Sequence, residues 1–217
     1  MSRPALEVTV TAPVASFRNP LYAVLQVGLP CPPPSTVGGM LAAAAGGWRH
    51  VPDTTRFAMA FRSQAKGTDL ETFHPLQQQG KPTSPTPKER DYLWGVELTL
   101  WLLDELEQWE RRLRRPVWPL RLGRSQDLAT ARTRHVELSN TPGTQGHALL
   151  PEADADDGEH LRMPTAVSLD RAHTRWGTYR YASDGSDRPA RDGLSTADGL
   201  AVVLLPPVHP DTAPTGS

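Results

Sequence analysis

Apolar and polar residues alternate in three segments of the chain, which cover residues 5–12, 56–62 and 92–102. Successive side chains of a strand point to opposite faces of a sheet, so a period of two predicts a strand with one buried face. β-Branched residues in the first segment favour the same structure. The alternation therefore predicts three strands.

Two other segments have helical patterns. Residues 37–45 are mostly small, Ser35 or Thr36 in front of them can cap the N-terminus of a helix, and a glycine pair follows them. Residues 102–115 repeat apolar positions at helical spacing, with acids early and arginines late, as the helix dipole favours. We predict a helix in each place.

A short strand expected at 119–123 completes the order strand, helix, strand, strand, helix, strand. Ferredoxin-like domains have this βαββαβ order, and RNA-recognition modules use it. We therefore predict an α+β fold with a ferredoxin-like, RRM-like domain over residues 1–130. The polar stretch over 63–90 is long for a connection in a compact domain and is expected to be functional or disordered.

The remainder of the chain has weaker patterns. Short strands are expected at 135–139, 165–170, 174–182 and 199–206. They predict a small β-rich extension over residues 131–205. The proline-rich end, residues 206–217, is expected to be a disordered tail.

Charge is distributed unevenly in this chain of 217 residues, whose formal net charge is −1. Residues 111–134 contain eight arginines and one acid, Asp127. A nucleic-acid contact face has this composition, but so does a solvated helix end, and charge alone leaves both interpretations open. Residues 152–159 contain five acids, but Asp157 stands where an EF-hand loop needs glycine, so we expect a solvated loop without metal.

The chain has a single cysteine, Cys31, and cannot form an internal disulfide. This fits a reducing cytoplasm, and we expect Cys31 to be a small buried residue rather than a nucleophile. No apolar run is long enough for a membrane span, and the N-terminus has no signal-peptide core, so no membrane partner is expected. The sequence contains no glycine-rich nucleotide loop, serine-hydrolase motif or zinc spacing, and we expect no cofactor.

The start of the first predicted helix is a candidate anion site. The first N–H groups of a helix lack partners within it, and the hydroxyls of Ser35 and Thr36 add donors. Gly38 removes a side chain that could keep a phosphate away, and the preceding prolines hold the entry rigid. The alternative is a tightly packed structural helix with an ordinary cap.

Three short segments, taken in order, resemble a known family. They are SFRNP (16–20), PPPSTVGGML (32–41) and LGRSQDL (122–128). Their order and spacing resemble the CRISPR-associated protein 5 family of type I surveillance complexes. The resemblance covers most of residues 6–130, and residues 131–217 carry no motif that matches.

The resemblance implies a ferredoxin-like core with a long thumb hairpin, here within residues 63–90. It implies a non-catalytic subunit that caps the 5′ handle of the CRISPR RNA in a Cascade complex. The implied partners are the CRISPR RNA, the backbone subunit, the large subunit and, through the complex, target DNA. Type I-B is the subtype we favour, because no nuclease set accompanies the motifs.

The resemblance also implies a set of RNA-binding residues. They are Phe17 and Arg18 near the handle, Ser35, Thr36 and Gly38 at its backbone, Arg124 and Ser125 at the end of the fourth strand, and Lys66, Lys81, Lys88 and Arg90 on the thumb. A phenyl ring and a guanidinium can stack on unpaired bases, although core packing is an equal alternative for Phe17.

Two other functions remain open. Some members of the family cut repeat RNA without metal and use a Tyr, Lys and His set. The nearest candidates here are His50 and His74, but neither stands beside a lysine, so we expect no catalysis. The second alternative is an assembly subunit whose contact with RNA is incidental.

Overall fold

The computed structural model describes residues 2–22, 27–73 and 85–214. Lys81 and His74 lie outside the described residues. The elements in chain order are β1 (Ser2–Ala15), α1 (Pro34–Ala45), η1 (Trp48–His50), β2 (Ala58–Arg62), β3 (Ala65–Phe73), β4 (Thr86–Leu102), α2 (Leu106–Arg114), β5 (Thr130–Ser139), β6 (Ala148–Pro151), η2 (Glu152–Asp154), β7 (Glu159–Val167), β8 (Thr174–Tyr181), β9 (Leu194–Ser195), β10 (Ala201–Val202) and η3 (Pro210–Thr212).

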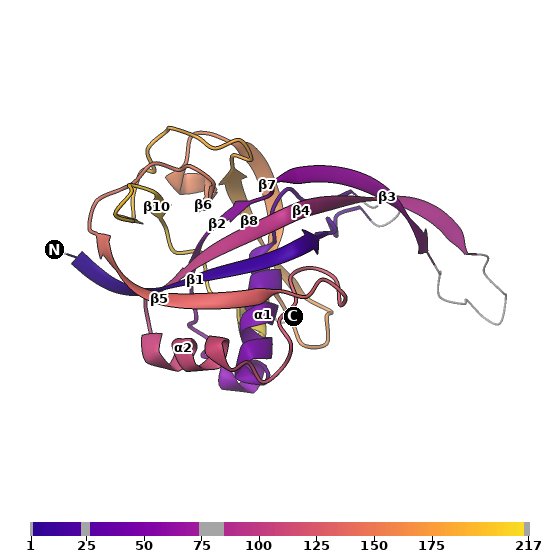
Figure 1. Ribbon diagram of the computed structural model, residues 1–217, viewed down its shortest axis with the longest axis horizontal. Helices are drawn as coiled ribbons and strands as arrows, with labels where there is room; N and C mark the ends of the chain where they lie inside the picture. Colours follow the sequence, from indigo (N-terminus) through magenta and orange to yellow (C-terminus); the bar gives the residue numbers. More distant parts are fainter. Residues whose placement is uncertain (1, 23–26, 74–84, 215–217) are drawn as a thin grey trace.

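The strands form one large sheet in a mixed α/β fold with two α-helices (Figure 1). The order is β10-β9-β5-β1-β4-β2-β6-β8-β7, and β3 joins as the partner of β4. Every pair of named strands is antiparallel. The N-terminal strand β1 is internal, because Leu6 pairs with Leu102 of β4 on one side and with His135 of β5 on the other.

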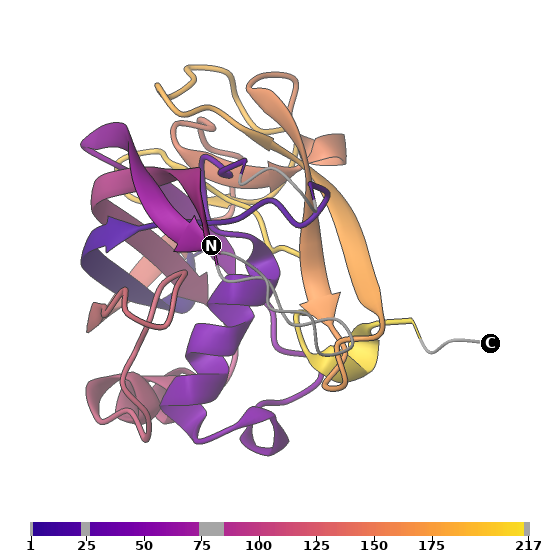
Figure 2. The same cartoon turned by 90° about the vertical axis from the view of Figure 1, so that its right-hand side faces the viewer.

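The two helices cover one face of the central strands (Figure 1). Leu6, Val8 and Val10 of β1 and Leu98 and Leu100 of β4 are buried in this layer, as the alternation predicted. Helix α1 lies between the central strands and the β7–β8 hairpin (Figure 2). The predicted strands at 5–12, 56–62 and 92–102 and both predicted helices are therefore confirmed, with shifted ends.

The start of α1 differs from the prediction. Pro33 is the N-cap residue, in an extended conformation, and no side chain donates or accepts a capping hydrogen bond. Ser35 and Thr36 lie inside the first turn instead. The reason is that Pro34 occupies the first helical position, which its ring favours, so the proline run itself begins the helix. The predicted end of this helix at the glycine pair is confirmed, because Gly46 caps its C-terminus in a left-handed conformation with φ 86°.

The fourth strand of the central sheet also differs. Residues 119–123 contribute only a bridge between Arg121 and Leu128, and the strand that pairs with β1 is β5. The chain turns back at Gly123, whose φ is 105° and where a Cβ atom would lie 2.8 Å from the Ser16 carbonyl oxygen. Part of the segment that was expected to form a strand, residues 119–123, therefore leads into this turn. The domain boundary expected near residue 130 coincides with the start of β5, which is a strand of the central sheet.

The C-terminal segment is packed where it is described, although a disordered tail was expected over 206–217. Val208 and His209 are buried, and the Nε2 atom of His209 lies 3.1 Å from the carbonyl oxygen of Trp48. Val208 lies against Gly38 of α1, where a Cβ atom would be 2.8 Å from its side chain. The missing side chain of Gly38 thus makes room for Val208.

Replacing Gly38 with alanine is expected to lower the free energy of unfolding by about 1–3 kcal/mol, the usual cost of adding a methyl group to a filled core. Gly39 is the matched control, because it is exposed and a Cβ atom there would meet nothing within 4 Å. Gly39→Ala should be neutral or stabilising, since alanine favours helix. Urea unfolding of both variants checks this, and equal midpoints would contradict the packing of Val208.

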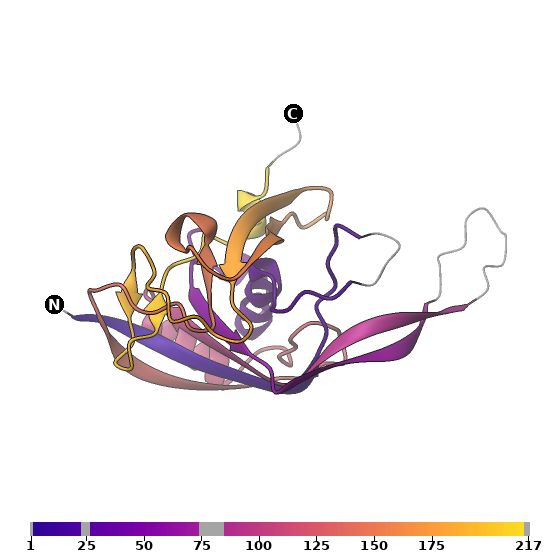
Figure 3. The same ribbon diagram turned by 90° about the horizontal axis from the view of Figure 1, so that it is seen from above.

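A hairpin occupies the place where the thumb was expected. Strand β3 pairs with β4 from Ala65 and Trp94 outward to Phe73 and Thr86. Seen from above, these strands project well beyond the helices and the remainder of the sheet (Figure 3). The hairpin leaves the body next to the turn that contains Gly123 and Arg124.

Candidate nucleic-acid interface

A cavity of about 620 Å³ lies at the root of the hairpin. It is lined by Val14 of β1, residues 65–69 of β3, Tyr92 and Trp94 of β4, and Arg124 and Gln126 of the following turn. Two residues of the predicted RNA-binding set, Lys66 and Arg124, are among these. The cavity therefore joins two parts of the sequence that were expected to contact RNA separately.

Arg124 is held in place by Asp127, which is only 3% exposed in its side chain. The Nε and Nη2 atoms of Arg124 donate to the two carboxylate oxygens of Asp127 at 3.0 and 2.7 Å. The Nη1 atom donates to the Tyr92 hydroxyl at 3.2 Å, and the guanidinium lies 4.6 Å from the centre of the Tyr92 ring. These three bonds fix the plane of the guanidinium on the cavity wall.

The charge of Arg124 is stabilised by the same contacts. Its hydrogen bond with Asp127 raises the pKa of the guanidinium, against a smaller opposing effect of burial. A guanidinium has five N–H donors, and three of them donate to Asp127 and Tyr92, which leaves two for a ligand within the described part of the chain. A fixed cation with spare donors is suited to a phosphate or to the edge of a base.

Trp94 is an exposed ring in the same cavity. Its side chain belongs to the apolar series of β4 that continues with Val96 and Leu98, yet the residue is 59% exposed. It pairs with Val14 on one side and Ala65 on the other. Its neighbour Leu93 is buried instead, because Gly95, with φ 57°, interrupts the alternation of β4 between Trp94 and Val96. Neither Trp94 nor Tyr92 was predicted as a site residue.

Phe17 is a core residue, so its burial favours core packing over stacking on RNA, the two alternatives that the sequence left open. It is 3% exposed, and its ring packs edge-on against Phe61 with the ring centres 5.7 Å apart. Arg18, the next residue, is exposed and forms a bridge with Gly28. The chain past the end of β1 therefore buries Phe17 and leaves the following residue, Arg18, exposed.

The start of α1, which was predicted as a phosphate site, is less accessible to a ligand than expected. Ser35 and Thr36 are half-buried, and the space above Gly38 is occupied by Val208. Gly38 therefore serves packing of the C-terminal segment. Ser125, in contrast, is exposed on the turn beside Arg124.

The hairpin cations have acidic neighbours across the strands. The Nζ atom of Lys66 lies 3.5 Å from Asp91, and Arg90 contacts Glu71. Lys88 is half-buried. Lys66 is the most accessible of these, with 64% of its side chain exposed, and its ion pair is of the weak surface kind.

Most arginines of the basic zone have partners within the fold. Their contacts are Arg111 with Glu107, Arg114 with Glu110, Arg112 with the Trp109 ring, Arg124 with Asp127 and Arg134 with Glu7. The acidic loop is similar, since Asp156 pairs with Arg191 and the Ser186 hydroxyl donates to Asp157. The end of α2 is thus mainly a set of surface ion pairs.

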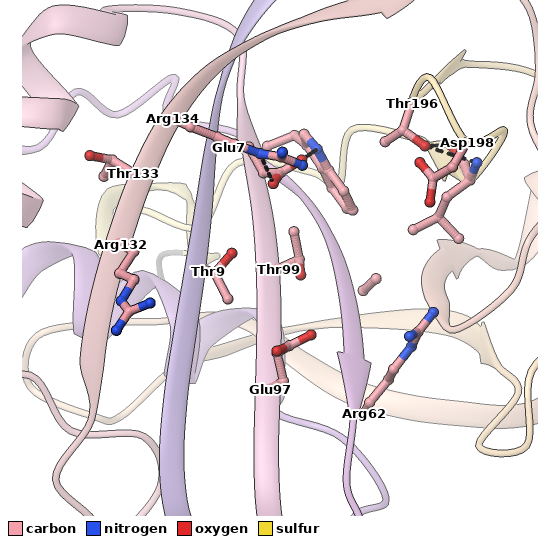
Figure 4. Close-up of a pocket in the computed structure, with 13 residues that line it drawn as sticks. Glu7, Thr9, Arg62, Glu97, Thr99, Arg132, Thr133, Arg134, Thr196 and Asp198 are labelled. Carbon is pink, nitrogen blue, oxygen red and sulfur yellow. Dashed lines mark hydrogen bonds and ion pairs between the residues drawn. The ribbon is translucent and has the colours of Figure 1, made fainter.

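A second cavity, of about 470 Å³, lies on the sheet face opposite the helices (Figure 4). Its charged lining consists of Arg62, Arg132, Arg134, Glu7, Glu97 and Asp198, which sum to zero formal charge. The buried Glu7 accepts hydrogen bonds from Trp101 and Arg134 at 3.2 and 2.6 Å. Its aromatic residue, Trp101, is buried, so this cavity has neither an excess of cations nor an accessible ring.

Several histidines are engaged within the fold. The Nε atom of Arg49 donates to His50 at 3.0 Å, and His135 and His160 lie 3.0 Å from Glu110 and Glu152. Burial raises the pKa of the Cys31 thiol, which keeps it protonated and poorly nucleophilic. Among the described residues, no group of three or more His, Cys, Asp or Glu side chains is placed to hold a metal ion. None of the described helices has the length and apolar character of a membrane span.

Solved structures of CRISPR proteins share this fold. One is a chain of a "CRISPR RNA-guided surveillance complex", with a TM-score of 0.56 and 17% identity over 91% of this chain and 93% of that chain. Another is a "CRISPR protein from Archaeoglobus fulgidus", with a TM-score of 0.50 and 13% identity over 94% of this chain and 99% of that chain. A search of the curated proteins found no match.

The family model described as "CRISPR-associated protein (Cas_Cas5)" matches residues 5–195. The match covers most of the chain, including the central sheet, both helices and the hairpin strands. This chain therefore belongs to the Cas5 family of CRISPR-associated proteins.

Proposed function

We propose that this protein is the non-catalytic subunit of a type I Cascade complex that holds the 5′ handle of the CRISPR RNA. The observation that carries the proposal is the cavity at the hairpin root, where Lys66, Arg124 and two aromatic rings converge. Unpaired RNA is recognised by rings that stack on bases and cations that contact phosphates. Membership of the Cas5 family supports the same role.

The arrangement of the central strands supports a ferredoxin-like core for this function. Helix α1 follows β1, helix α2 follows β4, and the order β5-β1-β4-β2 places the first and third strands of the motif in the middle. In the proposed complex the hairpin is the thumb. The proposed partners are the backbone and large subunits and, through the complex, target DNA.

The test uses the full-length protein without metal and a labelled guide RNA that carries or lacks its 5′ handle. We expect tighter binding of the guide with the handle and no cleavage of repeat RNA. Lys66→Ala should weaken binding at low salt and reduce the slope of log affinity against log salt by about 1. Arg191→Ala, which removes an exposed ion pair elsewhere, is the control and should leave binding unchanged.

Each other result favours one of the alternatives. A discrete cut in the repeat RNA would establish an endoribonuclease and direct attention to His50 and His74. Absence of RNA binding, together with binding to the backbone and large subunits, would establish an assembly subunit.

A further inference from the structure

We propose that Trp94 is a stacking platform for one unpaired nucleotide of the bound RNA, whose phosphate contacts Lys66 and Arg124. The inference rests on the proposed function and adds to it a specific side chain and a specific subsite. Its ligand is a single-stranded nucleotide, because the bases of a paired helix stack on one another and leave no face for the indole.

The exposure of Trp94 is the first argument. Trp94 and Trp101 lie on the same strand, but Trp101 is buried while Trp94 leaves 59% of its surface accessible. Trp94 also lines a cavity, with Val14 and Ala65 beside it. A large ring that is accessible within a cavity offers an apolar face to a flat ligand at little conformational cost.

The fixed cation is the second argument. Arg124 lines the same cavity, Asp127 and Tyr92 hold its guanidinium, and its side chain remains partly exposed. Because the guanidinium is already oriented, little side-chain entropy is lost when it binds a phosphate. Lys66 adds an ammonium group on a side chain that is 64% exposed.

The contrast with the second cavity, on the sheet face opposite the helices, is the third argument. That cavity combines equal numbers of arginines and acids with a buried tryptophan (Figure 4). It offers no accessible ring for a base, whereas the cavity at the hairpin root has Trp94, with the cations Lys66 and Arg124 and one acid, Asp69, in its lining. Of these two cavities, only that at the hairpin root has an accessible ring beside cations.

The test compares Trp94→Ala and Trp94→Phe with the wild-type chain in binding to oligoadenylate of about 12 nucleotides. Trp94→Ala should weaken binding by about 5- to 150-fold, the range that corresponds to loss of one base–aromatic stack, and Trp94→Phe should retain most of the affinity. Trp118→Ala is the control, because Trp118 is 58% exposed but lies outside the cavity lining.

A second probe separates stacking from charge. It is an abasic oligonucleotide of the same length, with the same phosphates and no bases. The wild type and Trp94→Ala should bind this probe equally, and both should unfold at similar urea concentrations, because an exposed ring contributes little to stability.

Equal binding of oligoadenylate by the wild type and Trp94→Ala would overturn the stacking role and leave the proposed function standing. An equal loss in Trp118→Ala, or a loss that persists with the abasic probe, would also overturn it. If the wild type bound neither oligoadenylate nor the guide RNA, the proposed function and the subsite would fall together.

Discussion

Replacing Phe17 with alanine is expected to lower the free energy of unfolding by about 3–5 kcal/mol, the range measured when a buried aromatic ring is deleted. The ring is 3% exposed and packs against Phe61, so its removal leaves a cavity in the core beneath the central strands. Any loss of RNA binding should then follow the fraction of unfolded protein.

Urea unfolding and RNA binding, measured on the same preparation, check this prediction. Phe17→Leu is the control, because leucine keeps most of the apolar volume. This variant should lose less free energy of unfolding than Phe17→Ala. A stable Phe17→Ala variant that failed to bind RNA would show that the ring faces the ligand, and the assignment of Phe17 to the core would be wrong.

Replacing Asp127 with alanine is expected to lower the free energy of unfolding by about 3 kcal/mol. This is the lower end of the range for removing one partner of a buried ion pair, because Arg124 remains partly exposed. The carboxylate also accepts the backbone N–H of Arg124 at 3.1 Å, so the turn loses its main internal hydrogen bonds. Arg124 should then swing away from Tyr92, and RNA binding should weaken along with stability.

Thermal unfolding and guide-RNA binding of Asp127→Ala and Asp127→Asn measure the two effects. Asparagine keeps an acceptor oxygen but not the charge, so its stability should lie between those of alanine and the wild type. If Asp127→Ala unfolded at the wild-type temperature, the carboxylate would not hold this turn.

The central elements could be predicted because their signals are local. Alternation marks β1 and the second half of β4, since these parts bury one face under the helices. Helix α2 has a buried stripe through Trp109 and Leu113, and α1 ends at a left-handed glycine. In each case the period of the apolar residues, or one turn residue, carries the structural information.

The remaining features depend on contacts between distant residues. The resemblance placed Phe17 near the RNA, with core packing as the alternative, and the structure buries its ring. The exposure of Trp94 depends on the backbone at Gly95, where φ is 57° and the alternation of buried side chains along β4 changes. The prolines near Val208 resemble those of a disordered tail. The segment is nevertheless ordered, because Gly38, which is far away in the sequence, leaves space for it.

The central position of β1 has a consequence for the synthesis of the protein. Strand β1 is synthesised before both of its partners, β4 and β5, which end at Leu102 and Ser139. At about 5–20 residues per second, β1 waits about 6–25 s for its last partner. Pairing over such long sequence separations is also slow in itself. The nascent chain therefore carries β1 without a strand partner until β4 has emerged, and it completes this part of the sheet only after β5 has emerged.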